Sequence, residues 1–435
     1  MAQYSSIPQL QEHIDALSSA IEAHERAVRD LRKRRSEARH TLNRFLDPMA
    51  RLPLEIQSHI FLSVDLDSEP PKPDPNAPPM VLTNVCRLWR NIALATPKLW
   101  HKLLMDLPRR PQYAELCELW LGRALSYPLS LQLRGSLRLD DGVQDLVTTH
   151  GDQLENLSFM AVSPYSLDAP CMMLDLDESF PLLSLKTLSF EADEAANFST
   201  MSDWLDVLRV APALSSLTMC NMLFDLWDDR EPLGFLTLPS LEVLHVGQPF
   251  RWMLSREHGS SALVLRYLTL PALKTLSVSE IDITEQDFVS FLSRSSPSLE
   301  EFHLTLPYEW PLSTGLLRFV SSLSFFELSS STTIAFLPFI EVLSTSDILP
   351  NLLALVLNST GHLDIADYGD ILSMLTFRWT SCPTRLESFA LNLASREARA
   401  DHTQDLPAAE VRAAMRRLVD DGLKIHIGPR SENLL

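Results

Sequence analysis

Glycine is scarce in this sequence, which leaves little material for loops that cradle phosphate groups. The chain has 12 glycines in 435 residues, whereas average usage of roughly 7 % would give about 30. The phosphate-binding patterns GxGxxG and GxxxxGK[ST] do not occur, and neither does the GxSxG nucleophile turn. These absences argue against nucleotide binding and serine-hydrolase chemistry, and the sequence predicts no cofactor.

Cysteine pairs and long apolar runs are also lacking. The five cysteines are scattered and form no CxxC pair, which argues against a disulfide framework or a zinc site and fits a reducing compartment. No stretch of about 18 apolar residues is available to span a membrane. The amino terminus has neither the basic start nor the apolar run of a secretory signal. We therefore expect an intracellular protein, in the cytoplasm, the nucleus or both, with no membrane contact.

Positive charge is the third deficit. The chain has 56 aspartates and glutamates against 37 lysines and arginines, so its formal net charge is −19. A surface of this charge repels phosphate backbones, which argues against general nucleic-acid binding. Apolar residues make up 46 % of the chain, enough for a large core, so a folded protein is expected.

Residues 7–46 have apolar side chains at the alternating three- and four-residue spacing of a heptad helix. The apolar seam positions are Ile7, Leu10, Ile14, Leu17, Ile21, Val28, Leu31, Ala38, Leu42 and Phe45, with His24 and Arg35 in the two gaps. β-Branched residues in one row and leucines in the other favour a parallel two-stranded coiled coil. Three interpretations remain: a homodimer through residues 7–46, a helix folded back on its own chain, and a helix paired with a partner. The basic cluster at 29–39 is interleaved with acidic residues and is expected on a solvated helix face.

Residues 48–105 predict a small module of two or three short helices. Proline suits the first turn of a helix, so Leu52-Pro53 begins the first one. A proline-rich insertion at 68–79 follows and predicts an extended, solvated loop. The segment VLTNVCRLWRNIALATPKLW at 81–100 supplies a second amphipathic helix and a final turn. A module of this size cannot cover all its apolar side chains, so it normally packs them against a partner or another domain.

This module resembles the F-box, and most closely the version abundant in fungal F-box proteins. The matching residues are Leu52, Pro53, Glu55, Ile56, Ile60, Phe61, Val85, Cys86, Trp89, Arg90, Ile92, Thr96, Pro97, Leu99 and Trp100. The resemblance implies docking to the Skp adaptor of a cullin–RING ubiquitin ligase and, through that adaptor, to cullin. The proline-rich insertion separates the two halves of the motif further than in compact members of the family.

The resemblance also implies which side chains touch the adaptor, because the Leu-Pro turn and the apolar faces of the first two helices do so in that family. The adaptor-binding residues implied here are Leu52, Pro53, Glu55, Ile56, Ile60, Phe61, Val85, Cys86, Trp89 and Arg90. The alternative is that Ile56, Ile60 and Trp89 form the internal core of the module. Leu52 and Pro53 discriminate between the two interpretations, because they are expected at its rim.

From residue 129 onward the chain repeats the pattern L-x-x-L-x-L with substitutions. The nine matches begin at Leu154, Leu185, Leu214, Leu241, Leu273, Leu299, Leu323, Leu352 and Leu386. Their mean interval of about 29 residues lies at the long end of leucine-rich repeats, which run roughly 20–29 residues. The array resembles the leucine-rich-repeat region that often follows an F-box. The asparagine or cysteine usual at the ninth position is absent, so the units are degenerate.

Two end pieces complete the array. Residues 128–133 alternate and predict a first strand, while a helix at 407–421 precedes a last strand at 423–427. We therefore predict an α/β solenoid of the leucine-rich-repeat type over residues 125–430, with a carboxy-terminal cap. Each unit of such an array buries its leucines only against its neighbours.

The positions between the leucines are expected to face the open side of the strands. Among them, His245, Glu301, His303 and Glu327 can meet across adjacent strands. A metal or acid–base cluster is one interpretation, and weak target-binding residues are the other. The second is favoured, and no metal is expected, because ligand spacing such as HExxH is missing.

The combined hypothesis is a non-catalytic subunit of a ubiquitin ligase complex. The F-box-like module would dock the adaptor, and the repeats would hold a protein target within reach of ubiquitin transfer, for ubiquitin-dependent protein catabolism. One alternative is a protein-interaction scaffold in which a coiled coil presents two solenoids. The other is an enzyme built on the solenoid, for which the sequence offers no ordered catalytic set.

Overall fold

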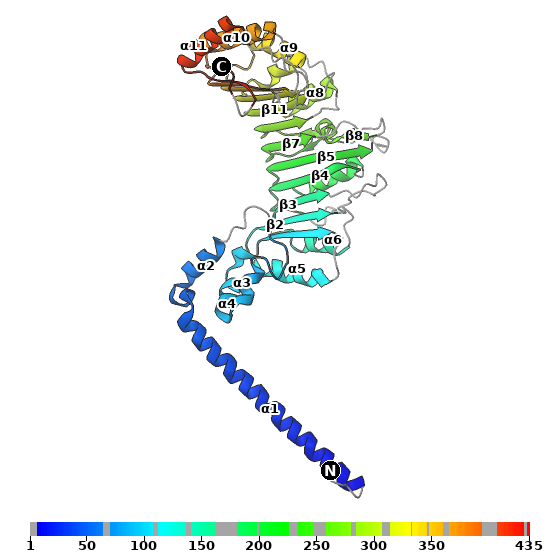
Figure 1. The fold of residues 1–435 in the computed structure, drawn as a ribbon. Coiled ribbons are helices and arrows are strands. Elements are labelled where there is room, and N and C mark those ends of the chain that lie inside the picture. The colour runs from blue at the N-terminus through cyan, green and yellow to red at the C-terminus, as the bar shows by residue number, and fades with distance from the viewer. Residues whose placement is uncertain are drawn as a thin grey trace. The chain divides into compact units, whose positions relative to one another are not determined.

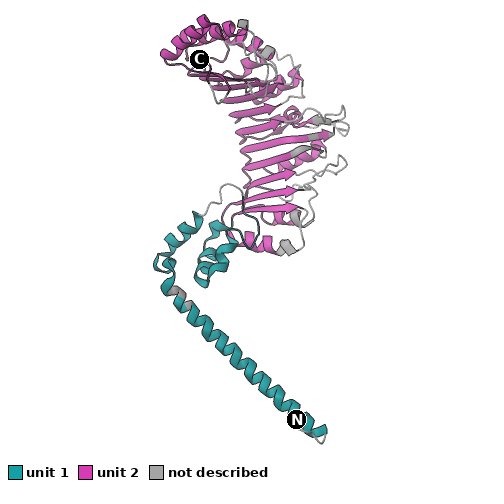
Figure 2. Ribbon diagram, in the orientation of Figure 1, with its two compact units in different colours: residues 1–100 teal, residues 101–435 magenta. Residues whose placement is uncertain are grey.

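The computed structural model shows an α/β protein with a long amino-terminal helix and a large parallel sheet (Figure 1). The chain divides into two compact units, residues 1–100 and residues 101–435, called unit 1 and unit 2 below (Figure 2). The structure describes residues 7–63, 70–107, 112–135, 141–161, 181–197, 200–225, 234–247, 258–279, 284–306, 314–331, 333–345, 348–359, 365–393, 407–429 and 433–435.

The regular elements that the structure describes in unit 1 are all helical. They are α1 (Ile7–Leu46), the short 3₁₀ turn η1 (Pro48–Arg51), α2 (Leu54–Leu62), α3 (Met80–Val85), α4 (Arg87–Leu94) and η2 (Pro97–Leu99). The helix predicted over residues 7–46 is thus present with those bounds. It ends at Leu46, because Asp47 has an extended backbone before Pro48. The Asp47 side chain accepts a hydrogen bond from the Met49 backbone N–H at 2.9 Å.

The proline-rich insertion is described from residue 70, and residues 68–69 lie outside the described part of the chain. We predicted a solvated loop, but Pro71 and Pro79 are buried. The loop leads directly into α3, and the Asn84 side-chain amide of that helix donates to the Pro75 carbonyl at 3.4 Å. Proline rings are apolar despite their low helix propensity, so part of the insertion packs on the module instead of extending into solvent.

Unit 2 is organised around one sheet whose main path contains twelve parallel strands, hydrogen-bonded in chain order (Figure 1). These strands are β1 (Lys102–Leu107), β2 (Leu129–Gly135), β3 (Leu154–Ala161), β4 (Thr187–Asn197), β5 (Ser216–Asp225), β7 (Val243–Gly247), β10 (Thr275–Ser279), β11 (Glu301–Leu306), β12 (Phe325–Ser330), β13 (Ala354–Ser359), β14 (Ser388–Leu393) and β15 (Lys424–Gly428). All nine L-x-x-L-x-L segments supply strands of this path, as do the predicted first and last strands at 128–133 and 423–427. The leucine spacing therefore placed the strands correctly.

Two short pairings lie beside the main path. The strand β8 (His258–Ser260) runs antiparallel to β5, and β6 (Leu236–Thr237) pairs with β9 (Leu268–Thr269) in a separate two-stranded sheet. Helical segments connect many of the parallel strands, as parallel pairing requires. They are α5 (Gln112–Arg123), α6 (Asp141–Thr149), α7 (Met201–Arg209), η4 (Ser261–Arg266), α8 (Glu285–Ser295), η5 (Thr314–Val320), η6 (Thr333–Phe336), α9 (Leu337–Leu343), α10 (Ile365–Thr380) and α11 (Ala409–Asp420).

The core of unit 2 lies on one face of the sheet. Strands such as β11 and β12 alternate buried and half-buried residues, and the buried rows are filled by leucine and phenylalanine. Aromatic rings join strand to strand, as in the stacked pair Phe302–Phe326 at 5.6 Å between centroids. They also join strand to helix, because Phe288 of α8 stacks on Phe302 at 6.2 Å. The half-buried rows therefore form the opposite, open face of the sheet.

The sheet begins earlier than we predicted. We placed the boundary of the repeat array at residue 125 and extended the helical module to residue 105. The strand β1 starts at Lys102, and both β1 and α5 belong to unit 2. The prediction was wrong because Leu103, Leu104 and Met105 are all buried. They form a continuous apolar run without the alternation that identified the other strands.

Candidate interaction surfaces

The helix α2 and the turn before it expose apolar side chains. Leu52 is 36 % exposed, Ile56 48 % and Ile60 40 %, and Pro53 is exposed as well. Ile56 and Ile60 are four residues apart on α2 and so share one helix face, one turn beyond Leu52 and Pro53. These four residues are called the α2 surface below. The alternative that Ile56 and Ile60 form the internal core of the module is not what the structure shows.

A buried glutamine fixes the turn that carries Leu52 and Pro53. The Gln57 side-chain amide donates to the Met49 carbonyl at 2.6 Å and to the Leu52 carbonyl at 2.8 Å. Gln57 is itself buried, so these two bonds satisfy its donor groups away from water. A turn already held by hydrogen bonds costs less ordering entropy when a partner binds. The sequence analysis did not single out Gln57.

An aspartate at the end of α1 organises the second half of the module. The Asp47 carboxylate accepts a hydrogen bond from Trp89 Nε1 at 2.8 Å and from Cys86 Sγ at 3.9 Å. Cys86 also caps α4, because its sulfur accepts from the Trp89 backbone N–H at 3.5 Å. Trp89 is half-buried, and its ring lies 5.2 Å from that of Phe61. Cys86 and Trp89 therefore hold the module together.

The remaining predicted adaptor-binding residues divide between surface and interior. Glu55, Val85 and Arg90 are exposed, and the Arg90 Nε donates to the Thr83 carbonyl at 2.8 Å. Phe61 is only 1 % exposed, so its assignment as a contact residue was wrong. Phe61 follows Ile60 directly, and neighbouring residues of a helix point about 100° apart. One therefore faces the core while the other faces solvent.

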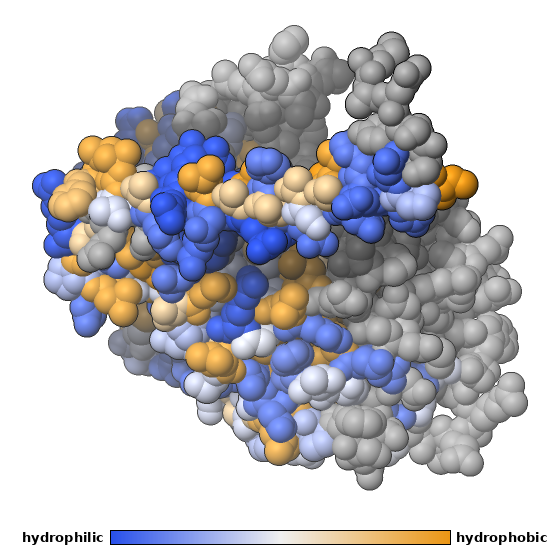
Figure 3. Space-filling model, turned by 90° about the horizontal axis from the view of Figure 1, so that it is seen from below, coloured by the Kyte–Doolittle hydropathy of each residue, from blue (hydrophilic) through white to orange (hydrophobic). Residues whose placement is uncertain are grey.

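The heptad seam of α1 is exposed along its length. None of the seam residues whose side chains the structure describes is buried, and the large apolar ones range from Leu10 at 43 % to Ile7 at 79 % exposed. Figure 3 shows apolar residues in orange lying at the surface among hydrophilic residues in blue. A helix that leaves such a stripe in water lacks the packing that stabilises most helices in proteins. The described seam residues therefore form a second candidate interaction surface.

The open face of the sheet brings two of the four predicted target-binding residues into contact. His303 Nδ1 of β11 lies 2.8 Å from Glu327 Oε2 of β12, its register neighbour. The other Glu327 oxygen accepts from Asn358 Nδ2 of β13 at 2.5 Å, and Asn358 in turn accepts from Asn392 Nδ2 of β14 at 2.8 Å. These four residues form a hydrogen-bonded row across four strands, called the polar ladder below.

The other two predicted residues lie apart from this ladder. His245 of β7 is separated from His303 by Ser277 of β10 in the strand register. Burial lowers the pKa of His245, and electrostatic interaction with His303 lowers it further. Glu301 is exposed and lies opposite Phe325 in the register of β11 and β12.

The sequence analysis did not connect Asn358 and Asn392 to His303 and Glu327. The strand register contains this connection. It aligns Ser329, Asn358 and Asn392 in one row, and Ser329 follows Glu327 by two residues on the same face of β12. An isolated position cannot reveal this relation, because the register follows from the stacking of successive units.

Two arginines on the helix side of the sheet bind backbone carbonyls at the end of the preceding helical segment and just after it. Arg294, in the last turn of α8, donates through Nη2 to the carbonyls of Leu265, Arg266 and Leu268 at 3.0–3.2 Å. Arg378 of α10 is 1 % exposed and donates to the carbonyls of Leu343, Thr345, Ile348 and Leu349. Burial lowers the pKa of both guanidinium groups. The carbonyls at a helix end lack partners within the helix. These contacts therefore join the end of one helical segment to the helix that follows it along the chain.

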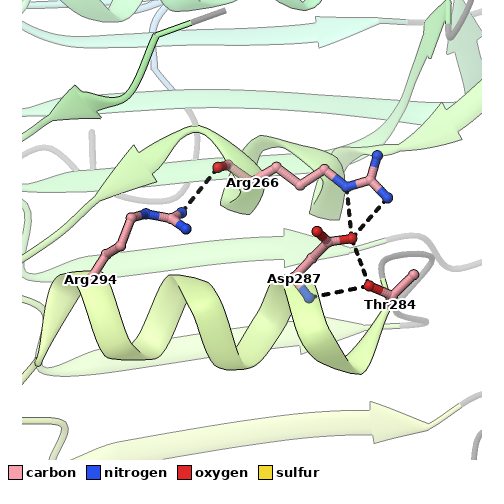
Figure 4. A network of polar contacts seen from close by, with 4 residues as sticks. All are labelled: Arg266, Thr284, Asp287 and Arg294. Atoms are coloured by element: carbon pink, nitrogen blue, oxygen red, sulfur yellow. Dashed lines mark hydrogen bonds and ion pairs between the residues drawn. The ribbon is translucent and has the colours of Figure 1, made fainter. Parts of the chain in front are cut away.

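Figure 4 shows how the first of these arginines belongs to a larger network. Arg266 donates to Asp287 at 3.0 Å through Nε, and Asp287 in turn accepts from the Thr284 hydroxyl at 2.7 Å. Burial acts to raise the pKa of Asp287, but the hydrogen bond from Thr284 and the charge of Arg266 bring it below its usual value. The network fixes both ends of α8 and contains no group directed at the open face.

Comparisons with known proteins give no assignment. The sequence matches no model of a known protein family and no curated protein. Within the described residues, no three His, Cys, Asp or Glu side chains gather in a group that could hold a metal ion. The described helices also include none with the length and apolar character needed to cross a membrane.

Proposed function

We propose that the protein is a substrate-recognition subunit of an SCF-type cullin–RING ubiquitin ligase, without catalytic activity of its own. In this proposal the α2 surface docks the Skp adaptor and the open face of the sheet binds a protein target. The observation that carries the proposal is the exposure of Leu52, Pro53, Ile56 and Ile60. These are the residues that the F-box resemblance assigns to adaptor contact, and apolar side chains in a small module seldom stay exposed without a partner.

The proposal includes a finer interpretation of both units. Residues 48–100 would be an F-box-like module, and the sheet of unit 2 would be a degenerate leucine-rich-repeat solenoid. The second interpretation is supported by the strand order, which follows the chain from β1 to β15, and by the buried rows of leucine and phenylalanine. Stacked units that bury their apolar residues only against neighbours are characteristic of such arrays.

The polar ladder supports a role in target recognition. His303, Glu327, Asn358 and Asn392 are half-buried and hold one another by hydrogen bonds, so their outward polar atoms are already positioned. Side chains ordered before binding lose less entropy when a ligand arrives. Phe325 lies next to this ladder, with its ring 5.1 Å from that of His303, and supplies an aromatic contact of the kind enriched at interfaces.

The test is a pull-down of the full-length chain with purified Skp adaptor. Wild type is expected to bind, and the double variant Leu52→Ala/Pro53→Ala is expected to lose at least tenfold in affinity. Leu119→Ala is the matched control, because it removes an exposed leucine from α5 in unit 2. Circular dichroism and thermal unfolding of each variant show whether the fold is intact. Failure of the wild type to bind the adaptor would overturn the proposal.

The exposed seam of α1 favours one second candidate function. A chain that does not bind the adaptor but self-associates through α1 would be a protein-interaction scaffold presenting two copies of the sheet. The pull-down separates the two functions, since only the ligase subunit requires the α2 surface.

A further inference from the structure

The two halves of α1 carry opposite charge. From Ile7 to Glu25 the helix has four acidic residues and neither lysine nor arginine. From Arg26 to Leu46 it has eight lysines and arginines against two acidic residues. Among the α1 side chains that the structure describes, the ion pairs Arg29–Glu25 and Arg34–Asp30 leave most of this imbalance uncompensated.

The basic half places charge at the apolar seam itself. Arg35 occupies a seam position, and Arg32, Arg34 and Arg39 occupy the positions that flank it in the heptad. Within the described part of α1, Arg32, Arg35 and Arg39 make no ion pair. A parallel pair would set each of these clusters against its copy, with Arg35 opposite Arg35 and Arg34 next to Arg39. Like charges in such contact are destabilising.

We propose that α1 pairs with α1 of a second copy of this chain in the antiparallel direction. Charge complementarity selects this partner and this direction, because the acidic half of each helix then lies along the basic half of the other. In the register that centres the pair on residue 26, Ile21 faces Leu31, and Leu17 faces Arg35. The long Arg35 side chain can lay its methylenes on Leu17 and reach outward to the acidic half.

The antiparallel direction also separates the like charges. The two Arg35 residues lie 18 residues apart along the pair, roughly 27 Å at 1.5 Å per residue, which exceeds the Debye length of about 8 Å at physiological ionic strength. The β-branched and leucine rows of the seam favour two strands in parallel, but parallel pairing brings the like charges of the basic half together, so the charges set the antiparallel direction. Since α1 leads directly into η1 and α2, the two α2 surfaces would begin at opposite ends of a rod about 60 Å long.

Sedimentation of the full-length chain tests self-association, without any adaptor present. Wild type is expected to form a dimer that Ile21→Asp/Leu31→Asp dissociates by at least tenfold in Kd. The matched control Ser19→Asp/Ala23→Asp adds the same charge to outward positions of the same helix and is expected to remain dimeric. A monomeric wild type, including one that binds an acidic helix of another protein instead, overturns the proposal.

Direction is tested by a spin label at an outward position of the acidic half. With Glu12→Cys, an antiparallel pair places the two labels roughly 42 Å apart along the axis, and a parallel pair brings them within about 20 Å. The chain labelled only at its native cysteines is the control. Added salt gives an independent test: raising ionic strength from about 0.05 to about 0.5 M should weaken an antiparallel dimer several-fold and strengthen a parallel one. A short label distance or tighter association in salt overturns the antiparallel assignment.

Discussion

The long helix α1 and the strands β10 to β14 both repeat apolar residues at regular spacing, yet they differ in what they bury. The seam residues of α1 that the structure describes are all exposed, whereas Leu276, Phe302, Phe326, Leu355 and Phe389 in the corresponding strand row are at most 1 % exposed. A strand in a stacked array has a neighbour of the same pattern on each side, supplied by its own chain. Among the described residues, α1 has no such neighbour along its seam, so its apolar stripe stays exposed.

This difference separates two uses of the same kind of residue. The periodic apolar residues of the strands in unit 2 are buried and stabilise the fold. The periodic apolar residues of α1 in unit 1 are exposed at the surface. The same division occurs within α2, where Phe61 is buried and its neighbour Ile60 is not. Truncating a covered apolar side chain should therefore cost more free energy of unfolding than truncating an exposed one.

The largest effect is expected from Phe302→Ala in β11. Phe302 is fully buried and stacks on Phe288 and Phe326. Truncating a buried phenylalanine removes transfer free energy and leaves a cavity, so the free energy of unfolding of unit 2 should fall by about 3–5 kcal/mol. Chemical denaturation measures this loss. Phe319→Ala, at a 43 % exposed position, serves as control, and an equal loss in both variants would contradict the assignment of the core.

The next comparison is between Phe61→Ala and Ile60→Ala in α2. Loss of Phe61 should destabilise unit 1 by about 3 kcal/mol, because its ring packs against Trp89. Loss of the exposed Ile60 should cost under about 1 kcal/mol and should instead weaken adaptor binding. Thermal unfolding and the adaptor pull-down report the two effects separately. If Ile60→Ala left binding unchanged, Ile60 would have to be removed from the α2 surface.

A third effect concerns the buried arginine of α10. Arg378→Met keeps an apolar stem of similar length but deprives four backbone carbonyls of their donor. Leaving buried acceptors unsatisfied should lower the free energy of unfolding of unit 2 by about 2–3 kcal/mol. The exposed Arg416 of α11 gives the matched variant Arg416→Met, expected to stay within about 0.5 kcal/mol of wild type. Similar stability of both variants would show that the carbonyl contacts contribute little.

A smaller effect is expected from pH at the open face. The pKa of His245 is lowered in the folded protein, so the unfolded chain takes up its proton first as pH falls. The stability that neutral His245 contributes is therefore complete above about pH 6.5 and is lost as pH falls below that value. Half-burial limits the effect to below about 1 kcal/mol. The free energy of unfolding should differ less between pH about 7.5 and about 5.5 in His245→Gln than in wild type. If the variant shows the same difference as wild type, His245 does not cause the pH dependence.

The smallest effect is expected in α1. Leu17 is 50 % exposed, so Leu17→Ala should change the free energy of unfolding of unit 1 by less than about 0.5 kcal/mol. Its consequence should be visible only in self-association, measured by sedimentation. A large loss of stability at concentrations where the chain is monomeric would mean that the seam packs within its own chain.

Much of the architecture could be predicted from local patterns. The heptad spacing gave the bounds of α1, and the leucine signature placed nine strands, because in each case the buried or seam residues recur at the period of the element itself. The beginning of the sheet could not be predicted in this way. Its first strand, Lys102–Leu107, follows the helical module without a signature of its own, and only pairing with β2 identifies it.

The sequence predicted which residues belong to the candidate sites better than it predicted what each residue contacts. The exposure of Leu52 and Pro53 follows from their place before a helix, and the pair His303–Glu327 follows from strands one repeat apart. The burial of Phe61, the carbonyl contacts of Arg378, and the links from Glu327 through Asn358 to Asn392 depend on distant segments brought together. No local window contains both partners of such a contact.

The period of the apolar residues in the sequence predicts the bounds of α1 and every strand of the main path except β1, because that period matches the geometry of those elements. The sequence by itself also determined the opposite charges of the two halves of α1. The tertiary structure alone decided which apolar residues are covered and which polar side chains meet, because burial and register depend on neighbours supplied by other parts of the chain.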